Sequence, residues 1–166
     1  MDRAHPMYVP TVLFSEVQYL ARNPIVLALV PASIITTSVL LLATAYQSGN
    51  AHLLWVWAGV TLFEILLFVA PRMRTTVTDR ELRISFFPFY WKTIPVENID
   101  TFEAVRYDAL SETGGWGIRS SRRYGRVVNV RGNQAVTLTA GRTRMLIGTQ
   151  RPDELLAALA TAAGPR

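Results

Sequence analysis

The sequence predicts a membrane protein in which an α-helical transmembrane hairpin is followed by a small α+β domain of about seven antiparallel strands and a C-terminal helix. Two long apolar runs lie close together near the start of the chain, and after residue 74 the pattern changes to short alternating stretches. The charges are also unevenly distributed, because only Arg3 and Arg22 of the 17 Lys and Arg residues lie within residues 1–70. Together these observations favour a membrane anchor joined to one small basic domain.

The first apolar run, residues 24–46, contains no charged residue over 23 positions. A helix of that length measures about 34 Å, enough to cross a hydrocarbon core of about 30 Å with some tilt. The polar residues 47–50 follow, as expected for a tight turn, and a second apolar run covers residues 51–70 with Glu64 inside it. We therefore expect a transmembrane hairpin over residues 24–70.

Basic residues flank both ends of this hairpin. Arg3 and Arg22 precede it, the juxtamembrane pair Arg72 and Arg74 follows it, and the turn between the two runs has none. By the positive-inside rule the protein is expected in the cell (inner) membrane as a multi-pass protein, with both termini cytoplasmic.

A cleaved signal peptide is the alternative, because residues 43–45 (Ala-Thr-Ala) match a signal-peptidase site. The apolar run is longer than a normal signal-peptide core and starts after 23 residues. Cleavage would also leave Arg72 and Arg74 outside, so we favour the hairpin.

The segment before the hairpin, residues 1–23, is expected to be cytoplasmic and amphipathic. Within residues 11–22, Leu13, Val17 and Leu20 recur at helical spacing. We expect a short helix lying in the inner membrane interface, with a helix packed on the soluble domain as the alternative.

Glu64 is the most chemically informative residue of the apolar runs. It lies six positions from the cytoplasmic end of its run, about 9 Å deep at 1.5 Å per residue. An ionised carboxylate there is costly, so we expect it to be protonated, paired or snorkelling, opposite residues 31–33. Ser33, Thr36 and Thr37 are expected to form a close-packing face. Since no second titratable group is near, a packing or partner-binding role is favoured over proton transfer.

The cytoplasmic domain is expected over residues 74–166. Its predicted strands cover residues 75–78, 81–86, 90–94, 101–107, 126–130, 135–139 and 144–148. Residues 108–123 are expected to form a long loop. Residues 152–163 are expected to form an amphipathic helix, because Pro152 suits its first turn and Asp153 and Glu154 complement its dipole.

Several short phrases occur in a definite order along the chain. They cover residues 14–18, 77–82, 94–95 with Ile99, 114–119 and 147–155. In these residues the chain resembles bacterial membrane proteins in which two N-terminal transmembrane helices precede a bacterial pleckstrin-homology-like (PH-like) domain. The resemblance implies a PH-like barrel or sandwich with a capping helix, and it implies no particular activity, because most members of this group have none assigned.

The residues that usually carry catalysis are scarce. The chain has no cysteine, which excludes disulfides and thiolate chemistry, and neither of its histidines, His5 and His52, can join a cytoplasmic cluster in the predicted topology. The glycines of residues 114–117 lack the spacing of a nucleotide-binding loop. We therefore expect a non-enzymatic protein with no metal site and no cofactor.

The best candidate contact surface is the arginine-rich segment 118–126. It holds Arg119, Arg122, Arg123 and Arg126, with Trp116 nearby. Four guanidiniums close together suit anionic headgroups or an acidic protein patch, at about 1 kcal/mol per basic group near an anionic surface. In the alternative, Trp116 closes one end of the barrel and the arginines are solvated or pair with Asp108 and Glu112.

We expect an integral membrane scaffold or interaction subunit. Its domain would bind a protein partner at the cytoplasmic face, while the hairpin packs against other membrane-protein subunits and membrane lipids. The alternative is a sensor of anionic lipid headgroups that uses the arginine-rich loop. Nucleic-acid binding is not expected, because no recognised motif accompanies the positive charge.

Overall fold

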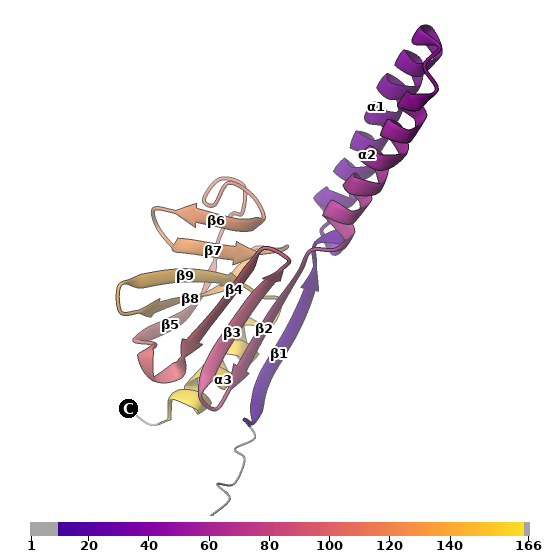
Figure 1. Cartoon of the computed structure of the whole chain (residues 1–166). Coiled ribbons are helices and arrows are strands. Elements are labelled where there is room, and N and C mark those ends of the chain that lie inside the picture. The colour runs from indigo at the N-terminus through magenta and orange to yellow at the C-terminus, as the bar shows by residue number, and fades with distance from the viewer. Residues whose placement is uncertain (1–9, 165–166) are drawn as a thin grey trace, which may run out of the picture.

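The computed structural model describes residues 10–164 of the chain. Within this range, nine strands form two sheets, and three α-helices accompany them. Two of these helices form a long hairpin that projects from one end of the β domain (Figure 1). Arg3 and His5 lie outside the described residues.

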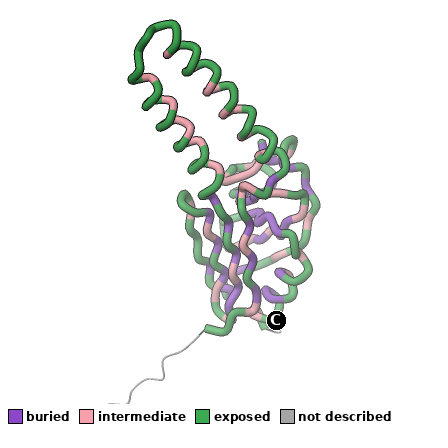
Figure 2. The backbone as a smooth tube through the Cα atoms, turned by 90° about the vertical axis from the view of Figure 1, so that its right-hand side faces the viewer, coloured by how far each residue is buried: buried purple, intermediate pink, exposed green. Residues whose placement is uncertain are grey.

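The hairpin consists of α1 (Pro24–Ser48) and α2 (His52–Val69), close to the expected limits of 24–46 and 51–70. With mean hydropathies of 2.5 and 1.9, both helices are long and apolar enough to cross a membrane. α1 ends at Gly49, whose φ of 64° is the left-handed conformation common after helices. Figure 2 shows the hairpin as exposed or half-buried along its length, in contrast to the β domain.

The segment before the hairpin is a strand, and the expectation of an amphipathic helix over residues 11–22 is wrong. β1 (Val12–Tyr19) pairs antiparallel with β2 (Arg72–Thr78), and a 3-10 helix, η1 (Leu20–Arg22), leads into α1. The hairpin is therefore inserted between two adjacent strands of one sheet. The β domain accordingly begins before the hairpin, and not at residue 74.

The residues buried in this strand are not the apolar ones at helical spacing. Phe14, Glu16 and Gln18 are buried, and the residues between them, Ser15 and Val17, are exposed or half-buried. Pairing with β2 puts the Phe14 ring into the core between the sheets, a burial that a helix lying in a membrane interface would not provide.

The first sheet has the order β1-β2-β3-β4, with antiparallel neighbours throughout. Its remaining strands are β3 (Glu81–Phe87) and β4 (Tyr90–Pro95), followed by the 3-10 helix η2 (Val96–Asn98). β3 and β4 end within one residue of the predicted strands, whereas β2 begins three residues before its predicted start at residue 75. The local signal is clearest in β3, whose buried side chains alternate with exposed or half-buried ones.

The second sheet has the order β5-β8-β9-β7-β6. Its strands are β5 (Thr101–Arg106), β6 (Gly117–Ser121), β7 (Gly125–Asn129), β8 (Gln134–Ala140) and β9 (Thr143–Gly148). β6 lies inside residues 108–123, which were expected to be a loop. β7 and β9 run parallel, so the described domain has neither the seven strands nor the purely antiparallel pairing that was expected.

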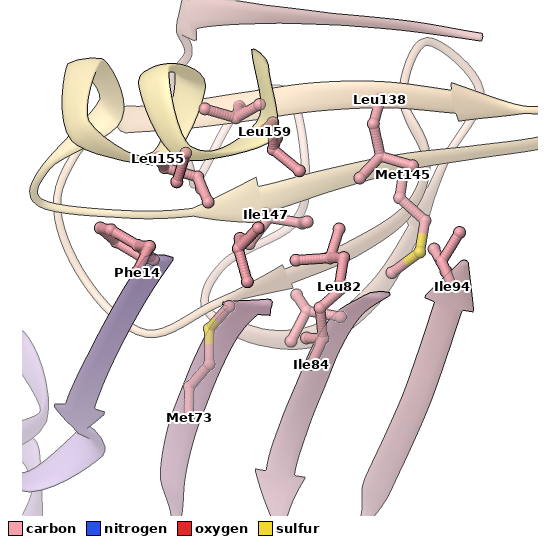
Figure 3. Packing of buried hydrophobic residues seen from close by; sticks show 14 of the residues in the cluster. Phe14, Met73, Leu82, Ile84, Ile94, Leu138, Met145, Ile147, Leu155 and Leu159 are labelled. Atoms are coloured by element: carbon pink, nitrogen blue, oxygen red, sulfur yellow. The ribbon is translucent and has the colours of Figure 1, made fainter. Parts of the chain in front are cut away.

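The main core lies between the two sheets and is closed by α3 (Pro152–Ala163), a helix with the predicted bounds. Leu155 and Leu159 of α3 are fully buried and meet side chains from both sheets (Figure 3). The labelled neighbours are Phe14, Met73, Leu82, Ile84, Ile94, Leu138, Met145 and Ile147. β1 thus contributes Phe14 to the same core as strands that follow the hairpin.

Candidate interaction surfaces

The helical hairpin leaves the domain through two neighbouring strands. In the last row of the first sheet, Tyr19 is paired with Arg72, and Arg72 with Phe87. Beyond this row the N–H of Leu20 donates to the carbonyl of Pro71 at 3.1 Å. Both helices therefore start from adjacent points of one sheet, and this end of the domain is called the foot of the hairpin below.

Asn23 joins α1 to the second sheet. Its Oδ1 accepts hydrogen bonds from the backbone N–H groups of Ile25 (3.0 Å) and Val26 (3.4 Å), which caps the first turn of α1. Its Nδ2 donates to the carbonyl of Val130 at 2.8 Å, just after β7. Asn23 therefore both caps α1 and forms a fully buried joint between the hairpin and the domain.

A second buried joint ties β1 to the connection between β9 and α3. The carboxylate of Glu16 accepts a hydrogen bond from the Thr149 hydroxyl at 2.6 Å and another from the backbone N–H of Gln150 at 3.0 Å. Gln18 Nε2 donates to the carbonyl of Gly148 at 2.9 Å. Two phrases noted in the sequence, residues 14–18 and 147–155, thus come together across the domain.

The arginine-rich segment 118–126 becomes β6, a turn and the start of β7, and the structure divides its arginines. Partners in a ladder share a face, so Arg119 lies on the face of Val127, while Arg126 lies on the opposite face. The charge of Arg126 acts on Tyr90, which belongs to β4 of the first sheet. Burial raises the pKa of Tyr90, and Arg126 opposes that rise. Arg119 and Arg126 therefore do not form one basic patch.

Arg123, in the turn between β6 and β7, is engaged within the domain. Its Nη1 lies 2.9 Å from Glu112 Oε2, and its guanidinium lies 5.1 Å from the centre of the Tyr124 ring. The Tyr124 hydroxyl donates to the same carboxylate at 2.7 Å. The backbone N–H of Asp108, with the Tyr124 hydroxyl and Arg123, holds the pKa of Glu112 below its ordinary value. Arg122, the residue before Arg123 in the same turn, is exposed.

Trp116 packs into the domain. It is half-buried against a second apolar cluster on the face of the second sheet that lies away from the main core. The cluster consists of Tyr107, Ala109, Tyr124, Val127, Ala135 and Leu146. Trp116 is thus half-buried on an outer sheet face, which differs from the expected closure of one end of the barrel.

Glu64 lies in the seam between α1 and α2. The Thr37 hydroxyl donates to its Oε1 at 3.2 Å, while Oε2 has no hydrogen-bond partner among the described residues. Glu64 is thus opposite Thr37, about one turn beyond the expected residues 31–33. A second bond across the seam runs from Trp57 Nε1 to Ser38 Oγ at 2.9 Å.

The hydroxyl-bearing face of α1 lines a groove on the hairpin. Ser33, Thr36 and Thr37 border it, together with Val26 and Phe68. Ser33 and Thr36 donate to carbonyls of their own helix, at 3.1 and 2.9 Å. These small side chains leave room for close approach of another helix, as in membrane helix packing.

The sequence reasoning missed a set of aromatic side chains at the foot of the hairpin. Phe87, Phe89 and Trp91 are 43%, 58% and 64% exposed, and they flank the turn between β3 and β4. The sequence feature that could have indicated this surface is the aromatic run at residues 86–91. Its pattern alone predicts only two strands and a turn.

The structure places Arg72 and Arg74 on β2 as exposed side chains of the first sheet.

No group of three or more His, Cys, Asp or Glu residues within 10–164 is arranged to hold a metal ion. Comparison of the chain with protein-family models, with curated proteins and with solved structures gave no match.

Proposed function

We propose that the chain is a two-span protein of the cell (inner) membrane whose β domain is a PH-like module that binds a protein partner at the cytoplasmic face. In this proposal it is a non-enzymatic subunit, and its hairpin packs against other membrane proteins. The observation that carries the proposal is the insertion of the hairpin between the paired strands β1 and β2.

The insertion constrains how the domain sits relative to the helices. A single flexible linker would be enough to keep a domain near a membrane. Here both helices continue into paired strands, and Asn23 adds a buried hydrogen bond to the second sheet. This arrangement suits a protein that must present one face of its domain in a set direction.

Charge supports the proposed orientation. Arg22, Arg72 and Arg74 are exposed at the foot of the hairpin, and the turn between α1 and α2 contains no Lys or Arg. The positive-inside rule then puts the domain in the cytoplasm. The PH-like assignment is supported by two packed sheets closed by a C-terminal helix, although the parallel pair of β7 and β9 departs from an antiparallel barrel.

The lipid-sensor alternative through the arginine-rich loop has weaker support. Arg123 is already paired with Glu112, and Arg126 lies on the other face from Arg119. The four guanidiniums therefore do not converge on one headgroup.

Single-cysteine labelling tests the topology, because the natural chain has no cysteine that would react. We expect Asn50→Cys, at the hairpin tip, to react with a membrane-impermeant maleimide in intact spheroplasts. Arg122→Cys, in the β6–β7 turn, should react only after the membrane is permeabilised. The reverse pattern would overturn the proposed orientation.

Site-specific photo-crosslinking in native membranes tests the partner. A photoreactive residue at Ser33 probes the hairpin groove, and one at Thr93 probes the outer face of the first sheet, with Leu42 and Gly141 as control positions outside these surfaces. We expect protein adducts of discrete mass at Ser33 or Thr93 and not at the controls. If all four positions gave no protein adduct, the scaffold proposal would fail.

A further inference from the structure

A band of aromatic and arginine side chains lies around the foot of the hairpin. It consists of Tyr19, Arg22, Arg72, Phe87, Phe89 and Trp91, and we call it the collar. Its members come from the end of β1, from η1, from the start of β2 and from the β3–β4 turn. Segments from both sides of the hairpin thus meet in one surface.

The strand register fixes the position of the collar. Phe87 is paired with Arg72, which lies only three residues beyond the end of α2 at Val69. The β3–β4 turn therefore lies at the end of the first sheet from which the hairpin projects (Figure 1). Trp91 is two rows further from the hairpin and on the same face of the sheet, because it pairs with Ser85 and through it with Arg74.

The aromatic members expose a large apolar area for a surface turn. Phe89, the most exposed phenylalanine of the collar, and Trp91 leave more than half of their surface free. Full burial of a Phe side chain is worth about 1.5 to 3 kcal/mol, so a neighbouring apolar phase would stabilise this turn. Exposed aromatic groups of this kind mark interaction sites, and Tyr and Trp favour the level of lipid headgroups.

The arginines of the collar are held against its rings. The Arg22 guanidinium lies 5.5 Å from the centre of the Tyr19 ring, and that of Arg72 lies 5.3 Å from the centre of the Phe87 ring. A guanidinium stacked in this way keeps its N–H groups available to bind phosphate oxygens in pairs. Arg22, Arg72 and the neighbouring Arg74 are exposed.

The surrounding charges favour an anionic partner. The last three rows of the first sheet, which end at Phe87, Tyr90 and Trp91, contain no acidic side chain in the described register. An anionic surface thus meets attraction from the three arginines and no repulsion from these rows.

We propose that the collar docks onto anionic phospholipid headgroups of the leaflet at the foot of the hairpin, with its aromatic rings in the interface and Arg22 and Arg72 on lipid phosphates. This inference rests on the proposed membrane-spanning hairpin. It places lipid recognition at the collar, and not at the arginine-rich loop. It also gives the domain a defined side toward the bilayer.

The test uses the full chain in vesicles of phosphatidylcholine and phosphatidylglycerol, with an environment-sensitive fluorophore on single cysteines. Phe89→Cys reports on the collar and Leu66→Cys on α2. Arg142→Cys, in the β8–β9 turn away from the hairpin, is the water-exposed control (Figure 1). Spin-labelled lipids with shallow labels quench a probe that lies in the interface.

We expect the probe at residue 89 to be blue-shifted and quenched by the shallow label, and the probe at residue 142 to show neither effect. If the probe at 89 behaves like the one at 142, the collar does not meet lipid and the inference fails. A probe at 89 that is shielded from water yet not quenched would also overturn it, in favour of a protein occupant. The probe at residue 66 should also be quenched, because α2 is proposed to span the membrane. If this probe is not quenched, the membrane-spanning hairpin itself is refuted.

The arginines are tested in the same system. The double variant Arg22→Gln/Arg72→Gln should lose the difference in quenching at residue 89 between mixed vesicles and vesicles of phosphatidylcholine alone. The matched double variant Arg142→Gln/Arg144→Gln removes the same charge from the β8–β9 turn and should keep that difference. Equal behaviour of the two variants would contradict a role for the collar arginines.

Discussion

Two glutamates show how differently the β domain and the hairpin use a carboxyl group. In the domain, both oxygens of Glu16 accept hydrogen bonds, from the Thr149 hydroxyl and from the Gln150 backbone. In the hairpin, Oε1 of Glu64 accepts one from Thr37, while Oε2 accepts none from the described residues. The first group is fully engaged in a structural joint, and the second leaves one buried oxygen without a hydrogen-bond partner among the described residues.

This difference between the two carboxyl groups reflects how the β domain and the hairpin are each stabilised. The domain buries apolar side chains against one another and ties its ends with buried polar bonds. The hairpin keeps many of its apolar side chains exposed, and in the proposed membrane setting lipid or neighbouring helices would cover them. We therefore expect substitutions at the joints of the domain to cost more than substitutions in the hairpin seam.

The largest effect is expected for Glu16→Ala. This change leaves the Thr149 hydroxyl and the Gln150 N–H without their acceptor inside the domain, which should lower the free energy of unfolding by about 3 kcal/mol. Thermal unfolding of the full chain in detergent, followed by far-UV circular dichroism, measures the loss. The control Glu97→Ala removes an exposed carboxylate and should have little effect. Equal midpoints for the two variants would contradict the joint.

Asn23→Ala should have the next largest effect. It removes both the cap of α1 and the hydrogen bond to Val130, which together are worth about 2 kcal/mol. Asn23→Asp keeps a capping oxygen, but its second oxygen faces the Val130 carbonyl in a fully buried site, so it should cost at least as much while the cap persists. Hydrogen exchange at the Ile25 and Val26 amides separates the two contributions. Identical exchange in both variants would argue against the cap.

The loop that carries Glu112 should respond to pH. Because the pKa of this carboxyl is lowered in the folded chain, its stabilising contribution is present above its ordinary pKa of 4.5 and is lost as the pH falls through the lowered value. Hydrogen-exchange protection factors over residues 108–116, which correct for the intrinsic pH dependence of exchange, should therefore fall in acid. Glu112→Gln should weaken this response and Glu103→Gln should not. A part of it should persist, because hydrogen bonds from the backbone of Ser111 and Leu110 also lower the pKa of Asp108.

The smallest effect is expected for Thr37→Val in the hairpin seam. Hydrogen bonds between membrane helices average about 0.6 kcal/mol, so the loss of the bond to Glu64 should be modest. Unfolding in mixed micelles measures it. Thr44→Val is the matched control, since the Thr44 hydroxyl bonds to the Leu40 carbonyl of its own helix. A cost above that of Glu16→Ala would reverse the comparison between the two regions.

The candidate sites were predicted from the sequence only in part. Glu64 and Thr37 were both identified, but their pairing needed the actual crossing of the helices. The arginine-rich segment is continuous in sequence, yet alternation along β6 and β7 sends Arg119 and Arg126 to opposite faces. The collar was not predicted from the sequence, because its residues come from segments on both sides of the hairpin and meet only through strand pairing.

The sequence by itself determined the two apolar helices, the C-terminal helix and most strands after the hairpin. Length, capping residues and local alternation specify these elements, and all three act over a few neighbouring residues. Only the tertiary structure decided that residues 12–19 form a strand, that β6 exists and that β7 runs parallel to β9. β1 and the parallel β7–β9 pair depend on partners distant in sequence, whereas β6 pairs with the adjacent β7; in all three, hydrogen bonds and buried contacts to the partner outweigh a weak local preference. The hairpin that looked like an anchor at one end of the chain is for the same reason an insertion within a sheet.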